Sequence, residues 1–594
     1  MSDNAGQGGA STAASAIERN QAARSARSQG QPAARDLSPT LLAILIAGLL
    51  VALYSLSQFD HDLWTPDEPR VAAVARETAD GAWVAPTLNG VPFLEEPPLH
   101  AWLTAGAYTA LGSERPELGR LISLLFGLGG VALTFLLARD VFAGEQSRST
   151  AMFAALALGL CLEYFAVSHR LLTDGPLAFF TSLSALFYWK AMNSAPGARR
   201  IARQLVGAGA ASLAFMTKGA VGVAVPLLFL VAVALVRRSL APLKASGLWL
   251  LPPVFLLVCG PWLLLLFQDE GGAGFRALFV ENTLWRIWPS SDYTGGHVRP
   301  FYYYLPRLVP LMGLSAVFSA GAVARRMVSP RELGERDREA VDLLLAWFGL
   351  GFLCLSLAGA KRGVYLTPFL PALAIVGGVW LRDYARGAAA GRLDRFLIWL
   401  AAACVAVAGC TPMALRLAFE AGWAPPGSPA ALMAGLGATV WLMAAVGTIS
   451  AALAVAFSAR RAPRLALASL LLGILLLALA AKFLIVPAVD ADKSLSAVSR
   501  RIGQIVPADA AIYAIRPDET TVAMLSLYAH RQTRALAEPS ELGTLVRRGP
   551  VYLVVVDKRP DQANFEAARN YGGKAVVDWG QGRSRRIRLL RFGQ

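Results

Sequence analysis

The chain of 594 residues is 55% hydrophobic and only 16% charged, whereas soluble domains are roughly a quarter charged. This composition excludes a large soluble enzyme and indicates a membrane-embedded protein. The net charge of +16 could suggest nucleic acid as a partner, but the basic residues gather in short loops between apolar runs, so we predict no nucleic-acid binding. The five cysteines all lie within apolar runs and show no ligand spacing, so they indicate neither a zinc site nor a disulfide framework.

The N-terminal segment, 1–38, is rich in Ala, Ser, Gln and Gly and carries scattered arginines. Such a composition cannot bury a core, so we predict a disordered cytoplasmic tail. A cleaved signal peptide would have its apolar stretch much nearer the start. The first apolar run is therefore predicted to stay as a membrane anchor.

Apolar runs of about 20 residues, the length that crosses a bilayer, recur about thirteen times and predict a polytopic α-helical transmembrane domain over 39–487. The expected spans lie near 40–58, 118–138, 150–167, 175–192, 203–217, 220–236, 247–267, 302–323, 340–357, 364–381, 396–414, 431–457 and 465–486. Basic residues follow every second span, which marks cytoplasmic loops by the positive-inside rule. These residues are Arg139, Arg148, Arg199, Arg200, Arg203, Arg237, Arg238, Arg325, Arg326, Arg382, Arg386, Arg460 and Arg461.

With a cytoplasmic N-terminus, the odd number of spans places the C-terminus on the extracytoplasmic side of a bacterial inner membrane. The same parity places the loop 59–117, the turn 169–174, the loop 268–301 and the pair 361–362 on that side. After residue 487 the hydropathy falls, so 488–594 is predicted to be a small soluble periplasmic α/β domain. Apolar or alternating runs predict strands at 511–515, 551–556 and 586–590, and amphipathic stretches predict helices at 494–505 and 562–571. The domain shows no compact catalytic motif, which favours a lid or a partner-binding module.

The first external loop is long, acidic and punctuated by prolines, notably over 60–70 and 89–100. Loops of this length are usually functional or disordered, and the aromatic residues at 64, 83, 93 and 102 favour an interfacial, partly helical loop. Asp67 precedes a stretch with helical spacing, where a carboxylate could simply cap the helix. A second acid, Asp174, lies at the outer end of another span, and an ionisable group beside hydrocarbon is costly enough to suggest a function.

Several motifs occur in a set order: Asp-Glu-Pro-Arg at 67–70, Leu-Asn-Gly at 88–90, Glu-Glu-Pro-Pro-Leu at 95–99, Thr-Asp at 173–174 and Lys-Arg-Gly-Val-Tyr-Leu at 361–366. Together they resemble the GT-C superfamily of lipid-dependent glycosyltransferases over roughly 40–380. The nearest members are the aminoarabinose transferases that modify lipid A, and protein mannosyltransferases are more distant. The resemblance implies transfer of a sugar from polyprenyl (undecaprenyl) phosphate to an extracytoplasmic acceptor, usually with inversion at the anomeric carbon.

By the same resemblance, Asp67 is the main catalytic carboxylate and Asp174 a second acid beside it. A departing lipid phosphate requires positive charge, and the candidates are Arg70, Lys218, Lys361 and Arg362. Arginine binds phosphate oxygens bidentately, whereas Lys218 could instead be an interfacial anchor whose ammonium reaches the headgroups. The substrate loop is expected to comprise Glu68, Glu95, Glu96, His100 and Tyr365.

One position departs from the pattern, because the aminoarabinose transferases usually carry a lysine where this chain has Glu96. Either Lys218 and Lys361 compensate for the lost charge, or the donor lies differently. A divalent metal ion is the one cofactor that the resemblance suggests, with Glu95 and His297 as its ligands. The Asp60-His61-Asp62 stretch is interpreted as a hydrated acidic segment.

Two other classes of protein remain open. A transporter or flippase of a lipid-linked or anionic substrate would carry charges near the bilayer midplane and paired discontinuous helices. A catalytically silent scaffold would bind partners through the C-terminal domain. The sequence names neither the sugar nor the acceptor, which could be lipid A, another envelope glycan or a protein, and it leaves the oligomeric state open.

Overall fold

The computed structural model describes residues 39–593 except 57, 113–114, 143, 291–295, 329–333, 390, 426–427, 548, 559–562 and 582–584. The predicted tail, 1–38, lies outside the described residues. The chain divides into two compact units, Met1–Gly48 and Leu49–Gln594. The described part of the first unit is the beginning of helix α2 (Pro39–Ser55), and the second unit holds all the other elements.

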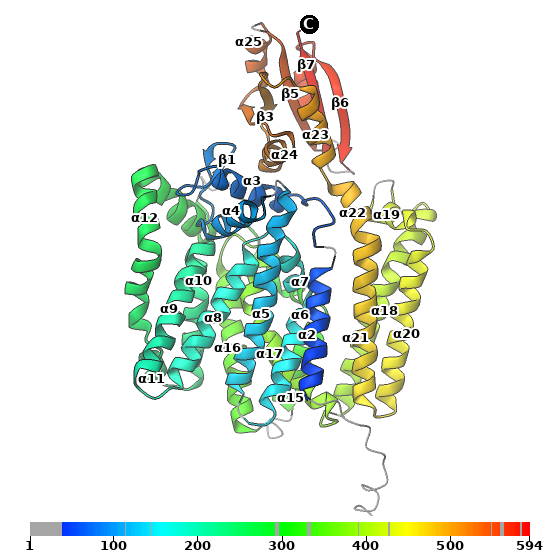
Figure 1. Ribbon diagram of the computed structural model, residues 1–594. Helices are drawn as coiled ribbons and strands as arrows, with labels where there is room; N and C mark the ends of the chain where they lie inside the picture. Colours follow the sequence, from blue (N-terminus) through cyan, green and yellow to red (C-terminus); the bar gives the residue numbers. More distant parts are fainter. Residues whose placement is uncertain are drawn as a thin grey trace, which may run out of the picture. The chain divides into compact units, whose positions relative to one another are not determined.

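The second unit contains a bundle of apolar helices (Figure 1). Among the described residues, seven helices are long and apolar enough to cross a membrane, and nine are if each of two bent pairs counts as one span. The polytopic helical fold is confirmed, and the number of thirteen spans stays a prediction. The elements of the bundle are α5 (Arg120–Val141), α6 (Ser147–Gly159), α7 (Leu162–His169), α8 (Asp174–Met192), α9 (Ala198–Lys218), α10 (Ala220–Val236), α11 (Ala241–Ser246), α12 (Leu251–Phe275), η3 (Arg276–Leu284), α13 (Trp285–Ile287), η4 (Phe301–Tyr304), α14 (Leu305–Met312), α15 (Leu314–Val328), α16 (Glu335–Leu357), η5 (Gly363–Phe369), α17 (Leu370–Ala385), α18 (Arg392–Glu420), α19 (Pro429–Gly435), α20 (Thr439–Ala459), α21 (Pro463–Ala480), η6 (Ala481–Ile485) and α22 (Val486–Lys493).

Two of the expected spans are broken. Helices α6 and α7 meet at 65°, and the segment 301–312 meets α15 at 110°. The second bend lies at Gly313, whose φ of +59° costs glycine little because it has no Cβ. A Cβ at this position would also lie 2.8 Å from the side chain of Leu162. The bend therefore depends on a single glycine.

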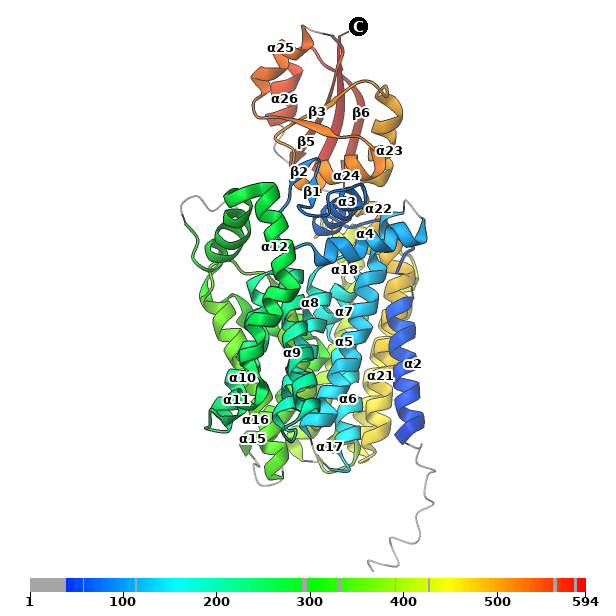
Figure 2. The same cartoon turned by 60° about the vertical axis from the view of Figure 1, so that its left-hand side comes forward.

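The loop 59–117 is partly helical, as expected, and contains α3 (Asp67–Ala79), β1 (Thr87–Leu88), β2 (Val91–Pro92) and α4 (Leu99–Leu111). Glu77 of α3 holds the tight hairpin, because its carboxylate accepts hydrogen bonds from the backbone N–H groups of Asn89 (2.6 Å) and Gly90 (3.0 Å). The two views of the ribbon place α3 and α4 between the helical bundle and the C-terminal sheet (Figures 1 and 2).

The C-terminal region forms the small α/β fold that the sequence predicts. Its five strands lie in the order β4-β3-β5-β7-β6, with β3 parallel to β4 and β5, and with β7 antiparallel to β5 and β6. Three of the strands lie at the predicted positions: β3 (Ile512–Ile515), β5 (Val551–Lys558) and β7 (Arg585–Phe592). The other elements are α23 (Ser496–Ile505), α24 (Glu519–Ala529), β4 (Thr533–Leu536), α25 (Leu542–Val546), α26 (Ala563–Arg569) and β6 (Lys574–Gln581).

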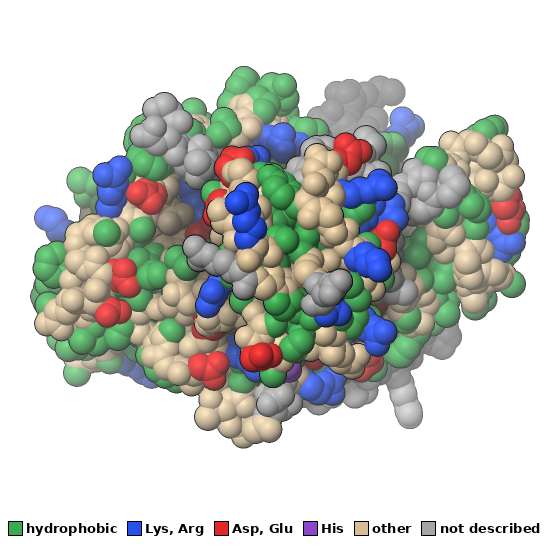
Figure 3. Space-filling view, turned by 90° about the horizontal axis from the view of Figure 1, so that it is seen from above, with side chains coloured by type: hydrophobic (Ala, Val, Ile, Leu, Met, Phe, Trp, Pro, Cys, Tyr) green, Lys and Arg blue, Asp and Glu red, His purple; other side chains and the backbone are tan. Residues whose placement is uncertain are grey.

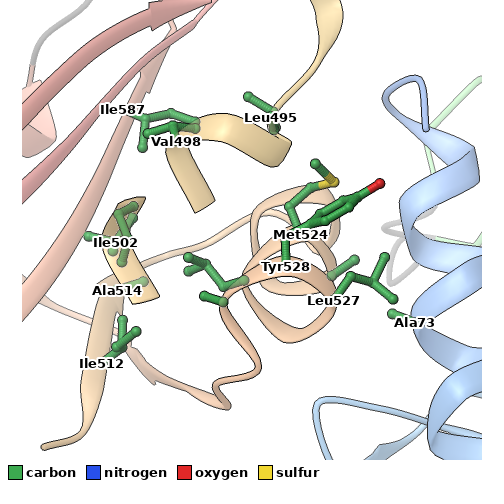
Figure 4. Close-up of a cluster of buried hydrophobic side chains, with 14 of the residues drawn as sticks. Ala73, Leu495, Val498, Ile502, Ile512, Ala514, Met524, Leu527, Tyr528 and Ile587 are labelled. Atoms are coloured by element: carbon green, nitrogen blue, oxygen red, sulfur yellow. The ribbon is translucent and has the colours of Figure 1, made fainter. Parts of the chain in front are cut away.

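The C-terminal domain packs directly on the first loop. Figure 4 shows Ala73 of α3 facing Leu527 and Tyr528 of α24, within one cluster of buried apolar side chains that includes both regions. The side-chain amide of Asn89 donates to the carbonyl of Thr533 (2.7 Å) and accepts from its N–H (2.9 Å), so it pairs with the edge strand β4. Burial of apolar surface is the main favourable term in such contacts, so the domain is fixed by a shared core as well as by its linker.

Candidate active site

The acidic motif at the start of α3 brings Asp67 against two arginines from different parts of the chain. The Nη2 of Arg362 donates to Asp67 Oδ2 at 2.5 Å, and the Nη2 of Arg70 lies 3.4 Å from Oδ1. Burial raises the pKa of Asp67, but the hydrogen bond and charge of Arg362, together with Arg70, outweigh it and hold the pKa below its usual value. Asp67 is therefore ionised at neutral pH and is a weak base.

Arg70 lies at the centre of three carboxylates. Its Nη1 is 2.8 Å from an oxygen of Glu519, which belongs to the C-terminal domain, and 3.5 Å from one of Glu95. Burial lowers the pKa of Arg70, but Glu95 and Glu519 outweigh it and raise the pKa. The Nε of Arg70 has no hydrogen-bond partner within the described residues. This buried N–H donor could bind a ligand oxygen, since an unmet donor is costly.

A second charged group lies where α8 begins and α9 ends. The ammonium of Lys218 is 2.7 Å from Asp174 and 3.5 Å from Glu96, and the Thr173 hydroxyl donates to Glu96 at 3.0 Å. The ring of Tyr365 lies 5.6 Å from the same ammonium. Burial raises the pKa of Glu96, but Lys218 and nearby arginines outweigh it and lower the pKa. The acid that departs from the family pattern is thus ionised and neutralises part of the charge of Lys218.

The other motif acid, Glu68, is turned away from this cluster and is buried in an ion pair. The guanidinium of Arg120 donates to both carboxylate oxygens of Glu68 (2.7 and 2.9 Å). Its remaining hydrogen bonds reach the carbonyls of Gln58, His61 and Asp62. Glu68 therefore anchors the loop that presents Asp67. Arg120 is not among the sequence-predicted site residues, although a charge at the end of an apolar run is a signal of function.

Lys361 and Arg362 are adjacent in sequence but differ in their surroundings. The ammonium of Lys361 is buried and donates to backbone carbonyls, those of Arg299 (2.9 Å) and Ala358 among them. Burial lowers its pKa. The backbone N–H of Lys361 bonds to the carbonyl of His297 at 2.9 Å. The Lys361 side chain thus holds the turn that directs Arg362 toward Asp67, and its donors are occupied by the backbone.

His100 is 2% exposed and lies near Glu96 and Lys218. Its Nε2 has no hydrogen-bond partner within the described residues, and burial lowers its pKa to about 4. His100 is therefore neutral at pH 7 and can donate or accept a hydrogen bond at a substrate.

The predicted metal ligands, Glu95 and His297, are poorly suited to a divalent ion. The carboxylate of Glu95 already pairs with Arg286 (3.3 Å) and with Arg70. Within the described residues no group of three or more His, Cys, Asp or Glu side chains is placed to hold a metal, whereas such ions need several protein ligands. A divalent metal ion stays a sequence-based prediction.

The fold of the chain is similar to that of solved membrane proteins. The crystal structure of ArnT from Cupriavidus metallidurans bound to undecaprenyl phosphate has a TM-score of 0.72, at 21% identity, and the match covers 92% of this chain and 97% of that one. The apo oligosaccharyltransferase from Archaeoglobus fulgidus has a TM-score of 0.50, at 13% identity, over 89% of this chain and 70% of that one.

The sequence comparisons confirm the resemblance stated from the motifs. A model of the dolichyl-phosphate-mannose-protein mannosyltransferase family matches residues 40–276. An undecaprenyl phosphate-alpha-4-amino-4-deoxy-L-arabinose arabinosyl transferase of Pseudomonas savastanoi is 28% identical over 56% of this chain and 60% of its own length. A second protein of that name, from Proteus mirabilis, is 27% identical over 58% of this chain and 60% of its own length. The matches thus span about three fifths of these relatives.

Proposed function

We propose that the chain is a membrane glycosyltransferase that moves a sugar from a polyprenyl phosphate carrier to an extracytoplasmic acceptor. The observation that carries the proposal is the ionised Asp67, held between Arg362 and Arg70 at the start of α3. A carboxylate beside several cations suits a reaction in which the sugar gains positive character and the leaving phosphate gains negative charge. The names of the relatives and the undecaprenyl phosphate bound to ArnT support this carrier.

The low pKa of Asp67 favours a positioning role over strong base catalysis. A carboxylate that is a weak base takes little of a hydroxyl proton before the transition state. The Asp67 carboxylate can still orient an acceptor hydroxyl. If the acceptor is itself a phosphate, no proton has to be removed from it. Asp174 would act as the second acid and orient the sugar through Lys218, whose ammonium lies 2.7 Å from its carboxylate.

The donor phosphate would bind the arginines around Asp67. The unpartnered Nε of Arg70 and the guanidinium of Arg362 offer directed N–H donors, which suit phosphate better than a point charge. Lys218 would contribute less, because Asp174 and Glu96 already neutralise it. The acceptor would bind on the extracytoplasmic side of a bacterial inner membrane. It would be lipid A, another envelope glycan or a protein.

The test is transfer from a polyprenyl-phosphate sugar by the purified chain in lipid nanodiscs. Asp67→Asn should reduce transfer by about 100-fold through lost positioning of the substrate, while expression and membrane insertion stay normal. Asp60→Asn is the matched control, because it removes an exposed acid from the same loop. Full transfer by Asp67→Asn would refute the role of Asp67. Mass spectrometry of lipid A and envelope glycans, with and without the gene, would identify the sugar and acceptor.

A further inference from the structure

The first turn of α24 brings the C-terminal domain to the candidate active site. The hydroxyl of Thr520 donates to the carbonyl of Pro66 (3.3 Å), one residue before Asp67. The carboxylate of Asp518 accepts from the N–H of Thr521 at 2.9 Å and so caps the helix start. The neighbouring Glu519 is thereby fixed at the backbone within reach of α3.

The three carboxylates around Arg70 are not equivalent. Asp67 is also bonded to Arg362, and Glu95 is also paired with Arg286. Glu519 pairs with Arg70 at 2.8 Å, and the part of the chain that the structure describes gives it no second cation. Its side chain is 51% exposed. Glu519 is therefore the carboxylate that can leave Arg70 at least cost, because water can solvate it.

The face of the molecule seen from above carries charges of both signs (Figure 3). On the face seen from above, the described acidic and basic side chains are interspersed, and no large patch of one sign gathers there (Figure 3). Long-range attraction or repulsion of an anion requires such a patch. At Arg70 an incoming phosphate meets the three carboxylates that contact this guanidinium, two of which are also paired with Arg362 or Arg286.

We propose that Glu519, supplied by the C-terminal domain, is a residue of the transfer site that competes with the donor phosphate for Arg70. Its carboxylate pairs with Nη1 of Arg70 and neutralises part of its charge while the donor site is empty. It is displaced into solvent when the donor phosphate binds. The C-terminal domain is then a part of the site and not only a lid. The inference rests on the proposed function, in which Arg70 binds the donor phosphate.

The test is equilibrium binding of farnesyl phosphate, a short polyprenyl phosphate, to the full chain in nanodiscs. Glu519→Gln keeps the shape of the side chain but removes the competing charge, so the Kd should fall by about two- to five-fold, the range of an exposed ion pair. Glu519→Asp keeps the charge and should bind close to wild type. Farnesol, which lacks the phosphate, should bind all three proteins equally.

Thr520→Val is the matched control for docking, because it removes a contact of the same helix turn without touching Arg70. If Glu519 is only a structural latch, both Glu519→Gln and Thr520→Val lower the thermal midpoint, and neither tightens farnesyl phosphate; that result overturns the proposal. Arg70→Gln distinguishes a failure of the proposed phosphate site from a failure of the role of Glu519. If it leaves the Kd unchanged, the proposed phosphate site is wrong. If it weakens binding while Glu519→Gln has no effect, only the role of Glu519 is wrong.

Discussion

The Arg120 guanidinium is fully buried, and its hydrogen bonds join Glu68 to three backbone carbonyls of the first loop. A lysine in this position has one compact ammonium, which cannot reach all the acceptors that the planar guanidinium of Arg120 bonds. Arg120→Lys should therefore leave part of the buried pair unsatisfied, at a cost of about 3 kcal/mol. The expected result is a lower thermal midpoint and faster trypsin cleavage within 59–117. Arg115→Lys, on an exposed side chain, is the control, and equal effects of the two changes would contradict the role of Arg120.

His100 makes stability depend on pH. Its pKa in the folded chain is about 4, below the usual value of about 6.5, so the unfolded chain binds more protons between these values. The stability that His100 contributes is complete above about pH 6.5 and is lost as the pH falls toward 4, with about 2 kcal/mol lost at pH 5. Thermal midpoints at pH 7.5 and pH 5 measure this loss.

The matched variant for that experiment is His100→Gln, which stays neutral at both pH values. It should show a smaller drop between pH 7.5 and pH 5 than the wild type. His61, whose pKa burial lowers to about 4, contributes with the same sign and is intact in both proteins. An undiminished drop in His100→Gln would show that His100 is not the group responsible.

The sequence predicts which residue types gather outside the membrane but not how they pair. The motifs point to Asp67, Arg70 and Arg362, and the structure brings these three together. The partners Arg120 and Glu519 lie 52 and 449 residues from the groups that they bond, and no spacing rule reaches that far. Lys361 and Arg362 are adjacent in sequence, yet Lys361 bonds to backbone carbonyls and Arg362 bonds to Asp67. Their positions in the sequence do not predict this difference.

At the scale of elements, long apolar helices are predictable and their breaks are not. The predicted span at 118–138 lies within the helical stretch Pro116–Val141, which is long and apolar enough to cross a membrane, because a hydrophobic run of that length favours a membrane helix. The run at 302–323 is equally apolar but bends at Gly313, where one positive φ redirects the chain. In the C-terminal domain, the strand β6 was not predicted, since it is an edge strand with little buried apolar pattern.

The hairpin between α3 and α4 supports the C-terminal domain through Asn89, which has a φ of +58°. The side-chain NH2 group of Asn89 donates to the carbonyl of Thr533, and its side-chain oxygen accepts from the N–H of Thr533. Asn89→Gly removes the two hydrogen bonds without adding strain at that φ, so the loss reports on docking, at about 1–2 kcal/mol. Hydrogen exchange of the β4 amides should become faster, while exchange in the membrane helices stays the same and is the internal control. Unchanged protection of β4 would mean that the apolar core alone holds the domain.

At the scale of the whole second unit, the two ends of the helical bundle differ. The end that carries the basic loops holds ion pairs between α10, α15, α16 and α17: Arg237 with Glu339, Arg326 with Asp342, and the buried Arg382 with Asp337. The candidate active site lies at the other end, under the C-terminal domain (Figure 1). Breaking a buried pair is costly, and the Arg382 side chain is 3% exposed, so its pair with Asp337 stabilises the packing of α16 against α17.

The orientation of the two ends in the membrane is a prediction that fusion proteins can test. The basic loops should face the cytoplasm by the positive-inside rule, which puts Asp67 and the C-terminus outside. Alkaline phosphatase, which is active only outside, should be active when fused after Gln594 and inactive when fused after Arg386. A cytoplasmically folding fluorescent protein should give the opposite pattern at the same two sites. If both reporters placed Gln594 inside, the number of spans would be even, the candidate active site could not share a side with an extracytoplasmic acceptor, and the proposed reaction would fail with it.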